Sequence, residues 1–350
     1  GPLELANDWF TLKLDPKTGG ITEWVNKNHP GNLIDNHKAN LNDYVYVLGG
    51  GLTNVQYVAT PKITVKESGP LEASLLVEGS APGTRSLSRE IRIYRDTPRI
   101  DIIDNLDKTD VLEVEAGHMA FPFNLPDGQV RLDSQFAVTR PEIDQIPGAN
   151  KNWFSVSRWA DISNPQYGVT LATLDAPLME VGGITATLIR SQGDPRVFRT
   201  KVEPTQTLYS WIFNNHWETN YKASQHGKLT YRYSLQTHEA YNALAAERFG
   251  VECSQPLLVF PAGGTVLAAP RMTIQPDNLL LTAFKSSDDG KALIARFFNP
   301  SDAPVTTQLR WSQPQPSELW RSDMSEKPLE KIHDTLTVPA WSLLTIRADF

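Results

Sequence analysis

The sequence predicts a nearly all-β protein in which a large domain is followed by a small C-terminal β-sandwich. Three observations predict this fold class. Runs of about five to ten residues with strand-like alternation recur along the chain, separated by turns rich in Gly, Pro, Asn and Asp. Only residues 238–249 combine good helix formers with apolar side chains at helical spacing. Residues 253–270, with three Pro and two Gly, break the strand pattern and mark a domain boundary.

The chain opens with a predicted hairpin. Residues 5–14 end in strand-like alternation, and residues 21–25 return as the second strand. The intervening residues 15–20, DPKTGG, form a turn because Pro presets its own φ and Gly adopts positive φ readily. The polar residues 26–42 are a predicted loop, and residues 44–48 a short strand.

A series of strands follows from residue 62, with the segments ITVKES, LEASLLVEGS, SLSREIRIYRD and RIDIIDNLD. Residues 89–95 alternate charged and apolar side chains, which predicts a strand with one face in water. Asp101 and Asp104 on the next strand are accordingly predicted to be solvated.

Residues 113–123 form a predicted strand with His118 among apolar neighbours. We interpret this side chain as a core histidine whose hydrogen bonds are satisfied. Residues 136–153 contain two Pro and one Gly and are a predicted loop. Loops of this length are uncommon unless they carry function or cover another element.

The next predicted strand, residues 154–163, presents Arg158, Trp159 and Asp161. Asp161 and Glu218 are the two carboxylates predicted to lie in polar, aromatic-rich surroundings. A glycosidase needs two carboxyl groups about 5 to 9 Å apart, and these two are the candidates. Both carboxylates serve equally well as hydrogen-bond partners for Arg158 or for backbone groups, so the pair alone is a weak signal.

Residues 211–233, WIFNNHWETNYKASQHGKLTYRY, are the most unusual stretch of the chain. Asn214, Asn215 and His216 come in succession, so strand alternation would turn at least one of them inward. A buried polar group needs a hydrogen-bond partner, and Arg158, Asp161 or Glu218 could provide one. Flat rings beside amide, imidazole and carboxylate groups suit a sugar, with its apolar C–H faces and rim of hydroxyls. The alternative is a strand end whose Asn and Thr residues cap a turn.

The predicted helix at residues 238–249 has Gly250 as its C-cap. Residues 1–3, Gly-Pro-Leu, resemble the remnant of a cleaved expression tag, and we expect the natural protein to extend further at its N-terminus. The predicted domains are residues 4–255, the large β domain, and residues 256–350, the small β-sandwich.

Composition excludes several classes of function. A net charge of −7 without a basic patch argues against nucleic acid or an anionic membrane as partner. No apolar run is long enough to span a membrane. The single cysteine, Cys253, excludes an intrachain disulfide and a Cys-rich zinc site, and neither an HExxH nor a GxSxG motif occurs. The compartment stays open; a periplasmic or extracellular location is compatible with this composition if the source is bacterial.

Several stretches together resemble the C-terminal β-region of glycoside hydrolase family 38, the α-mannosidases. They include residues 4–14 with the DPKTGGI turn, AFPF at 120–123, RPEIDQIPGANKNWFSVSRWADISN and YGVTLATLDAPLMEVGG. Further similar stretches are residues 211–235 and the tail strands LTAFKSSDDGKALIARFFNPS and LTVPAWSLLTIRADF. The likeness spans nearly the whole chain, and NNHWETNY is its most specific part.

This resemblance implies a large two-sheet supersandwich, similar to galactose mutarotase, followed by a small β-sandwich. In the family, the zinc ion and the nucleophilic aspartate belong to an N-terminal α/β domain. The resemblance therefore implies that no cofactor binds this chain, that zinc is held by that upstream domain, and that this chain alone is inactive. Its partners would be a mannoside or related glycan and the catalytic domain of the same polypeptide. The residues expected to shape the sugar-binding cleft are Arg158, Trp159, Asp161, Asn214, Asn215, His216, Trp217, Glu218, Asn220 and Tyr221.

Two other classes remain open. One is a stand-alone carbohydrate-binding or mutarotase-like protein in which His and Glu perform acid/base chemistry at an anomeric carbon. The other is a protein related to polysaccharide lyases, because residues 214–221 hold the Asn, His and Tyr with which such enzymes abstract a proton. Activity on a uronic-acid polymer or on a mannoside would distinguish these classes.

Overall fold

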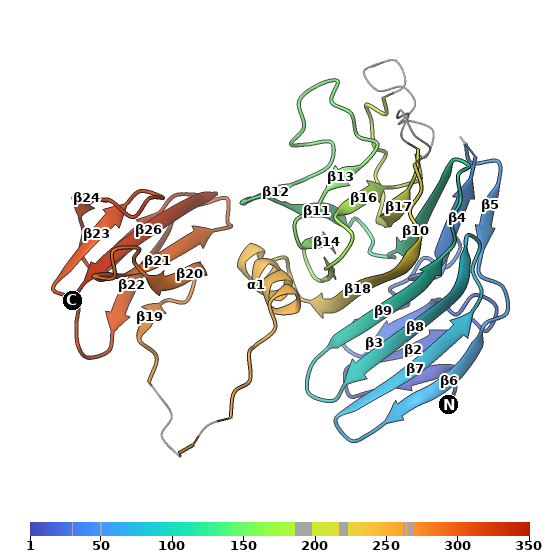
Figure 1. Cartoon of the computed structure of the whole chain (residues 1–350), viewed down its shortest axis with the longest axis horizontal. Helices are drawn as coiled ribbons and strands as arrows, with labels where there is room; N and C mark the ends of the chain where they lie inside the picture. Colours follow the sequence, from blue (N-terminus) through green and yellow to red (C-terminus); the bar gives the residue numbers. More distant parts are fainter. Residues whose placement is uncertain (30, 50, 186–197, 217–222, 262, 265–268) are drawn as a thin grey trace. The chain divides into compact units, whose positions relative to one another are not determined.

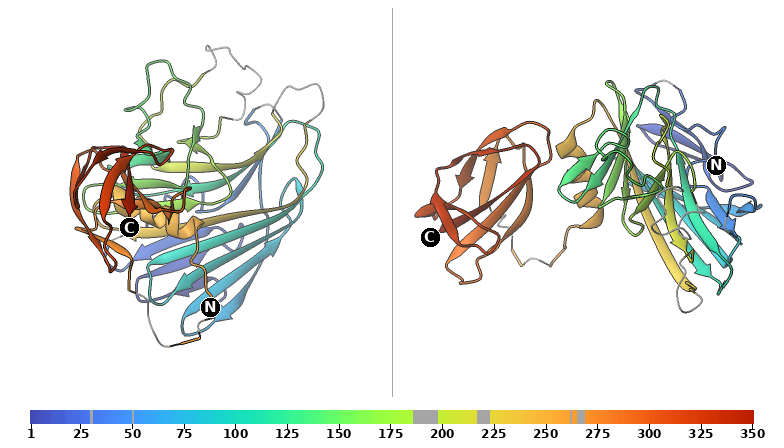
Figure 2. Two further views of the ribbon diagram at one scale, coloured as in Figure 1. Left: turned by 60° about the vertical axis from the view of Figure 1, so that its left-hand side comes forward. Right: turned by 90° about the horizontal axis from the view of Figure 1, so that it is seen from above.

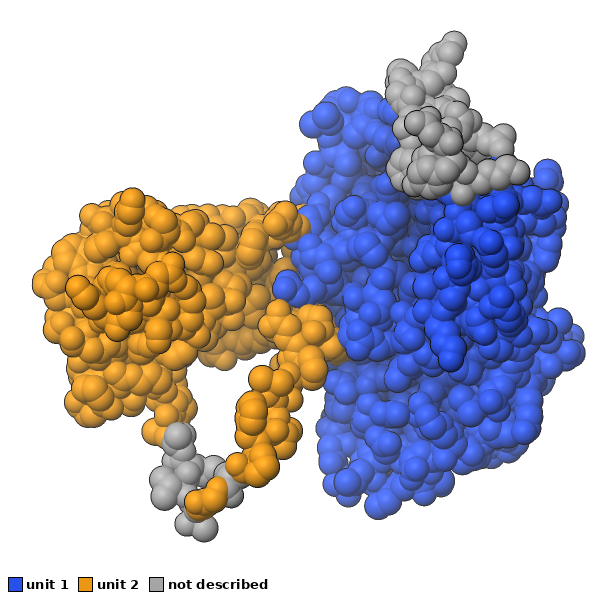
Figure 3. Space-filling view, in the orientation of Figure 1, with its two compact units in different colours: residues 1–134, 139–241 blue, residues 135–138, 242–350 orange. Residues whose placement is uncertain are grey.

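The computed structural model describes residues 1–29, 31–49, 51–185, 198–216, 223–261, 263–264 and 269–350. Within these residues it contains one helix, α1 (Ala243–Ser254), and is otherwise built of strands and loops, which confirms the all-β prediction. Two compact units are found (Figure 3): residues 1–134 with 139–241, and residues 135–138 with 242–350. The units divide before α1, whereas the sequence-based division at residue 255 comes after it and stays a prediction.

The first large sheet has nine strands, of which the eight from β11 to β6 belong to the larger unit, and each pair of neighbours among these eight runs antiparallel. In order across the sheet they are β12 (Ala137–Thr139), β11 (Gln129–Ser134), β14 (Trp159–Ser163), β15 (Gly168–Thr173), β18 (Gly227–His238), β9 (Arg99–Lys108), β8 (Thr84–Tyr94), β7 (Glu72–Gly79) and β6 (Lys62–Ser68).

The second sheet has six strands and lies against the first (Figures 1 and 2). Its order is β13 (Phe154–Ser155), β16 (Leu178–Val181), β17 (Thr207–Asn214), β10 (Glu115–Pro122), β4 (Tyr44–Leu48) and β5 (Val55–Tyr57). A small third sheet consists of β1 (Glu4–Ala6), β2 (Phe10–Leu14) and β3 (Ile21–Asn26), so the predicted N-terminal hairpin is confirmed.

One hydrophobic core fills the space between the two large sheets. Phe121 of β10 meets Tyr233 of β18 with ring centroids 4.9 Å apart, and the Tyr233 hydroxyl donates a 2.9 Å hydrogen bond to Ser210 of β17. Because successive side chains of a strand point to opposite faces, the neighbours of these core residues project from the outer faces of the sandwich. Each of the two sheets therefore presents one outer face on which a site can be built.

The smaller unit packs a three-stranded sheet and a five-stranded sheet around a second core. The strands of the first, in order, are β19 (Met272–Gln275), β22 (Val305–Trp311) and β25 (Thr335–Val338). Those of the second are β20 (Leu280–Ser286), β21 (Ala292–Asn299), β26 (Ser342–Asp349), β23 (Glu318–Ser322) and β24 (Pro328–Lys331). This arrangement confirms the predicted small β-sandwich. In the described part of the chain, no helix is long and apolar enough to cross a membrane.

The helix begins five residues later than predicted. Residues up to His238 continue β18, because this strand pairs with β15 through to Gly168. The helix begins after Asn242, whose side-chain oxygen accepts a hydrogen bond from the backbone N–H of Ala245. Gly250, predicted as the C-cap, is a buried residue inside the helix.

Two strand predictions also need correction. Residues 154–163 are two strands, not one: β13 belongs to the six-stranded sheet and β14 to the nine-stranded sheet, so the chain crosses the sandwich here. Arg89 and Asp104 are fully buried and form an ion pair of 2.7 Å, although the alternating pattern placed them in water. Arg89 has the same parity as Ile91 and Ile93 of its strand, which face the core.

Candidate functional site

The outer face of the six-stranded sheet carries a cluster of aromatic and ionisable side chains. In the strand register, His118 of β10 lies opposite Trp211 of β17, and Tyr209 lies opposite Glu180 of β16. Paired residues and their second neighbours share a face, so these four side chains project together, away from the main core. Next to them the face carries small residues such as Ala120, which leaves room above the sheet for rings.

A histidine and a carboxylate meet at the centre of this face. Nε2 of His118 lies 2.8 Å from Oε2 of Glu180, within ion-pair distance but without hydrogen-bond geometry, and both side chains are fully buried. The other carboxylate oxygen accepts hydrogen bonds from the backbone N–H (2.7 Å) and hydroxyl (2.6 Å) of Thr185. The imidazole also stacks on the indole of Trp211, with centroids 5.8 Å apart and an interplanar angle of 12°. A histidine held by a carboxylate can transfer a proton to or from a ligand that reaches it.

Further rings surround this pair. Trp153 meets Trp211 edge-on at 5.6 Å, and the His216 ring meets it edge-on at 6.0 Å. Nδ1 of His118 and the indole N–H of Trp211 are buried, and neither has a hydrogen-bond partner among the described residues. Buried polar atoms without partners are rare, because burying such a group costs free energy unless it is hydrogen-bonded. The face thus combines aromatic surface with polar atoms that are ready to bond.

Two loops are tied together beside this face. The backbone N–H of Lys151 donates to the carbonyl of Arg199 (2.7 Å), and the backbone N–H of Arg199 donates to the side chain of Asn152 (3.1 Å). The Glu142 carboxylate accepts from Lys151 Nζ at 3.0 Å and from the backbone N–H of Val202. The long loop predicted at residues 136–153, which the structure interrupts with β12, is therefore tied to residues 199–202, a second segment without helix or strand.

Asn215 follows β17 and has a structural partner set that the sequence did not suggest. Its Oδ1 accepts from the backbone N–H of Glu115 (2.6 Å), and its Nδ2 donates to the carbonyls of Val111 (3.0 Å) and Glu113 (2.6 Å). The partners are backbone groups, not the predicted Arg158, Asp161 or Glu218. Asn215 therefore holds residues 111–115 beside the end of β17, while Asn214 accepts from the backbone N–H of His216 at 3.4 Å.

Four other predicted site residues, Trp217, Glu218, Asn220 and Tyr221, lie outside the described residues. The candidate carboxylate pair of Asp161 and Glu218 therefore stays a prediction.

The remaining three predicted residues lie at the other sheet. Ala160 and Ile162 of β14 face the core, so Trp159 and Asp161 project from the outer face of the nine-stranded sheet. Asp161 is fully buried there and accepts hydrogen bonds from Ser163 (2.6 Å) and Thr170 (2.8 Å). Arg158 precedes this strand. Among the predicted site residues that the structure describes, Trp159 and Asp161 thus lie at the nine-stranded sheet, whereas Asn214, Asn215 and His216 lie at the end of β17 in the six-stranded sheet.

Asp133 of β11, on the same outer face as Asp161, has an unfavourably buried carboxyl group. Its side chain is 2% exposed, and its Oδ2 has no hydrogen-bond partner within the described residues. Burial raises the pKa of this carboxyl to about 7, against the lowering effect of the charge and backbone N–H of Arg158. Between pH 3.8, the ordinary pKa of an aspartate, and pH about 7, Asp133 holds a proton in the folded protein that it has released in the unfolded chain. Asp133 therefore costs stability as pH rises through this window.

We expect Asp133→Asn to stabilise the protein at pH 8 and to change little at pH 4. A pKa raised from 3.8 to about 7 corresponds to a loss of at most about 4 kcal/mol in the free energy of unfolding at pH 8. We expect Asp133→Asn to recover about 1 to 3 kcal/mol of it, because the amide must also be accommodated. The measurement is urea unfolding at both pH values. Asp127→Asn, an exposed carboxyl with φ of 57°, is the matched control and should be neutral at both. An equal stabilisation by Asp133→Asn at pH 4 and pH 8 would contradict the argument.

Sequence reasoning assigned no site role to His118, Glu180, Trp211 or Trp153, and it interpreted His118 as core. The burial is as predicted, but the prediction that its hydrogen bonds are satisfied is wrong: neither ring nitrogen has a hydrogen-bond partner among the described residues, and Glu180 lies at ion-pair distance. A usable signal was present: Glu180 lies between Met179 and Val181 in an apolar strand, and His118 lies in another. Two buried ionisable side chains on separate apolar strands each need a partner, and each can supply the other.

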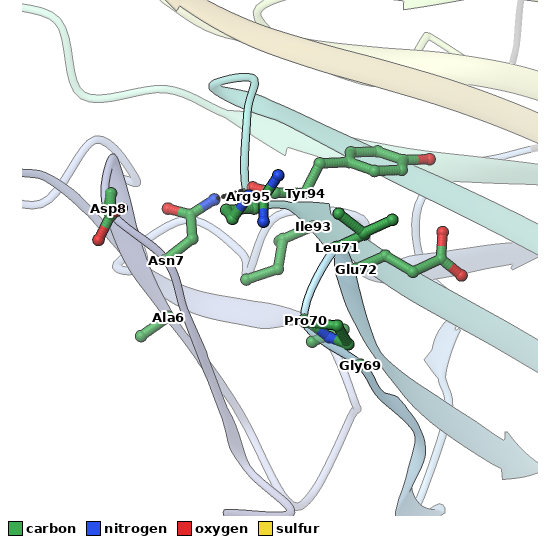
Figure 4. A pocket seen from close by; sticks show the side chains of 11 residues that line it. Ala6, Asn7, Asp8, Gly69, Pro70, Leu71, Glu72, Ile93, Tyr94 and Arg95 are labelled. Carbon is green, nitrogen blue, oxygen red and sulfur yellow. Dashed lines mark hydrogen bonds between the residues drawn. The ribbon is translucent and has the colours of Figure 1, made fainter.

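No three His, Cys, Asp or Glu side chains gather so as to hold a metal ion in the part of the chain that the structure describes. The described residues also form hollows elsewhere. One of about 170 Å³ is bounded by Asn7 and Asp8 on one side and by Leu71, Glu72 and Arg95 on the other (Figure 4). Another, of about 610 Å³, lies in the smaller unit between α1 and strands β19 and β20. Neither hollow includes the residues of the candidate site.

Comparisons with known proteins cover most of the chain. Residues 5–195 match the model of the glycosyl hydrolases family 38 C-terminal domain, and residues 278–346 match that of the family's C-terminal beta sandwich domain. No curated protein matches the sequence.

Among solved structures, an alpha-mannosidase from Enterococcus faecalis V583 is similar, with a TM-score of 0.74 and 14% identity over 99% of this chain and 42% of that one. A protein in the Glycosyl Hydrolase Family 38 from Enterococcus faecalis has a TM-score of 0.72 and 14% sequence identity, and the match covers 99% of this chain and 44% of that one. A galactose mutarotase related enzyme from Lactobacillus acidophilus has a TM-score of 0.40 and 9% sequence identity, and the match covers 68% of this chain and 99% of that one. No conclusion is drawn from a TM-score this low. At such identities the likeness shows the fold alone, and this chain spans less than half the length of the first two.

Proposed function

This chain belongs to glycosyl hydrolase family 38 through that family's C-terminal domain, and from this premise we propose that it is the carbohydrate-handling β-region of an α-mannosidase-like glycoside hydrolase. The outer face of the six-stranded sheet would form one wall of the sugar-binding cleft. One observation carries this proposal: His118, which lies 2.8 Å from Glu180, stacks on Trp211, and Trp211 in turn meets Trp153 edge-on, next to buried polar atoms that lack partners among the described residues.

The ring surface and the polar atoms serve different parts of a sugar. Indole rings pack on the apolar C–H faces of a pyranose, while imidazole and indole N–H groups bond its hydroxyls. Because a buried and unpaired polar group is costly, a ligand that pairs it gains affinity over one that cannot. The predicted residue His216, whose ring meets Trp211 edge-on, would extend the same wall.

The catalytic zinc and the nucleophile would come from a part of the polypeptide outside this chain. A bound zinc ion polarises an oxygen of the substrate or its attacking group. This chain would contribute only side chains that bind and orient the sugar.

We expect this chain alone not to hydrolyse an aryl α-mannoside, with or without added zinc, because binding groups by themselves cannot activate water. The measurement is release of the aryl alcohol by purified protein over several hours. Metal-dependent turnover that persists through repeated purification would contradict the proposal. The positive control is a longer family member that carries the upstream region.

We expect Trp153→Ala to weaken binding of an α-mannose oligosaccharide about tenfold or more. Trp153 is only partly buried and packs on Trp211, so its ring can reach a ligand at the edge of the face. A tenfold loss of affinity corresponds to about 1.4 kcal/mol of binding free energy, which the loss of one stacked ring can account for. Titration calorimetry measures it. Trp9→Ala removes a 37% exposed indole ring elsewhere on the larger unit and should leave affinity unchanged. Equal losses in both variants would point to a general effect.

A second candidate function is acid/base chemistry at an anomeric carbon, as in an aldose epimerase. The 2.8 Å contact of His118 with Glu180 favours it, whereas the complete burial of both side chains limits access by a substrate. Polarimetry with freshly dissolved aldoses distinguishes the two functions. If the protein accelerates mutarotation and His118→Gln abolishes the acceleration, the epimerase is favoured. If the protein does not accelerate mutarotation, the β-region of a hydrolase is favoured.

A further inference from the structure

The segment that leads out of the larger unit is held by a histidine. His238 is the last residue of β18, and the larger unit ends three residues later at Tyr241. Nε2 of His238 lies 2.7 Å from Oδ2 of Asp161, and its Nδ1 lies 2.6 Å from the carbonyl oxygen of Glu239. Both ring nitrogens thus face oxygen acceptors. Only an imidazolium carries two N–H groups and can donate to both.

The surroundings hold both ends of this short segment. The Asp161 carboxylate also accepts from Ser163 and Thr170, so it is fixed in position. Arg131 of β11 donates to Ser163 at 2.9 Å, and its guanidinium lies 4.2 Å from the ring centroid of Tyr241. The Trp159 ring is 6.4 Å from the same tyrosine. Trp159 and Asp161, which the sequence assigned to a sugar site, therefore contact the two ends of residues 238–241.

The charged groups around His238 come from three sources. Asp161 is in contact, and Arg131 on the neighbouring strand has Nη1 3.9 Å from Asp161. The exposed Glu239 carboxylate lies 3.7 Å from His29. Burial of His238 favours the neutral ring, but one carboxylate in direct contact opposes it.

We propose that His238 is a pH-dependent latch on the connection between the two units. When the ring is protonated, it ties residues 239–242 to β14 through Asp161. When the ring loses a proton, one of its two nitrogens faces an oxygen with a lone pair, the bond to Asp161 or to the Glu239 carbonyl is lost, and the segment opens.

The direction of the effect follows from the charge balance. Burial lowers the pKa of His238, yet the hydrogen bond and charge of Asp161 outweigh it, so that the pKa is raised above its ordinary 6.5. The latch is therefore fully closed below pH 6.5. It is lost as pH rises through the raised pKa of the folded state.

Hydrogen exchange of peptides covering residues 239–246, measured by mass spectrometry at pH 6.0 and pH 8.5, tests the latch. After correction for the intrinsic rate, we expect protection to fall about tenfold or more at pH 8.5. His238→Gln should show the low protection at both values. His226→Gln, near the other end of β18 and 65% exposed, should behave as wild type. Peptides from β9 serve as the internal reference for global stability.

Equal protection at both pH values in the wild type would overturn the proposal, and so would a pH difference that survives in His238→Gln. If that variant does not fold, a wild-type series at half-unit steps decides alone. A transition midpoint above 6.5 confined to the connecting peptides supports the latch, and a midpoint shared with β9 peptides overturns it.

Discussion

Replacing Arg89 with methionine is expected to lower the free energy of unfolding by about 3 to 5 kcal/mol. Arg89 lies on β8 and Asp104 on β9, directly opposite in register, and both side chains are fully buried in the core between the two sheets. Nε of Arg89 donates to Oδ1 of Asp104 at 2.7 Å, and Nη1 donates to the carbonyl of Gly19 at 3.3 Å. Methionine fills much of the space but leaves the carboxylate buried without a counter-ion.

The same pair of strands offers a matched control. Arg85 and Asp107 form an ion pair of 2.9 Å in which Arg85 is 63% exposed. Arg85→Met should cost less than about 1 kcal/mol, because water solvates the partner left behind. Urea unfolding followed by tryptophan fluorescence measures the stability of both variants. Because the chain has two units, each unfolding transition is fitted separately. The double variant Arg89→Met with Asp104→Leu should recover most of the loss. Similar losses in Arg85→Met and Arg89→Met would contradict the argument.

Arg89 also shows what alternation can and cannot predict. The segment Arg89-Glu90-Ile91-Arg92-Ile93 predicts a strand, which is confirmed as part of β8. Its parity places Arg89 with the two isoleucines, but a charged residue at the end of a charged and apolar pattern was assigned to water. Burial of Arg89 depends on Asp104 being opposite, and register between two strands is a tertiary property that single-strand patterns do not contain.

The stretch at Asn214–His216 shows the same limit at the candidate site. Alternation predicted that a polar residue here turns inward and needs partners, and Asn215 is indeed 7% exposed. The predicted partners were charged side chains, whereas the actual ones are backbone groups of residues 111, 113 and 115. Backbone donors and acceptors are present at every residue, so composition cannot indicate which of them a side chain will meet.

The pairing of His118 with Glu180 depends on strand order. The two residues are on β10 and β16, which are not neighbours, because β17 lies between them. Their contact spans β17 beside Trp211, and the order of these three strands is not in chain order. Sequence reasoning could indicate that each side chain needs a partner, but only the sheet topology brings the two together.

Replacing Lys108 with methionine is the second substitution with a large expected effect, and it acts beside the candidate site. Nζ of Lys108 lies 2.6 Å from Oε1 of Glu115, and these side chains are 0% and 1% exposed. The other oxygen of Glu115 accepts a 2.6 Å hydrogen bond from the Tyr46 hydroxyl, and Lys108 lies 5.1 Å from the ring centroid of Phe213. Without the ammonium group, Glu115 keeps one neutral partner for a buried charge, so we expect a loss of about 3 to 5 kcal/mol.

The loss should also reach the sugar-binding face. Glu115 is the residue whose backbone N–H holds Asn215, and His216 follows directly with its ring against Trp211. We therefore expect Lys108→Met to weaken glycan binding at temperatures where the variant remains folded. Lys108→Met with Glu115→Gln removes both charges and should restore stability. Lys13→Met, at a surface pair with Glu23 in which the lysine is 49% exposed, is the control and should change neither property. A Lys108→Met variant as stable as Lys13→Met would contradict the argument, because it would mean that the Tyr46 hydroxyl alone compensates the buried Glu115 carboxylate.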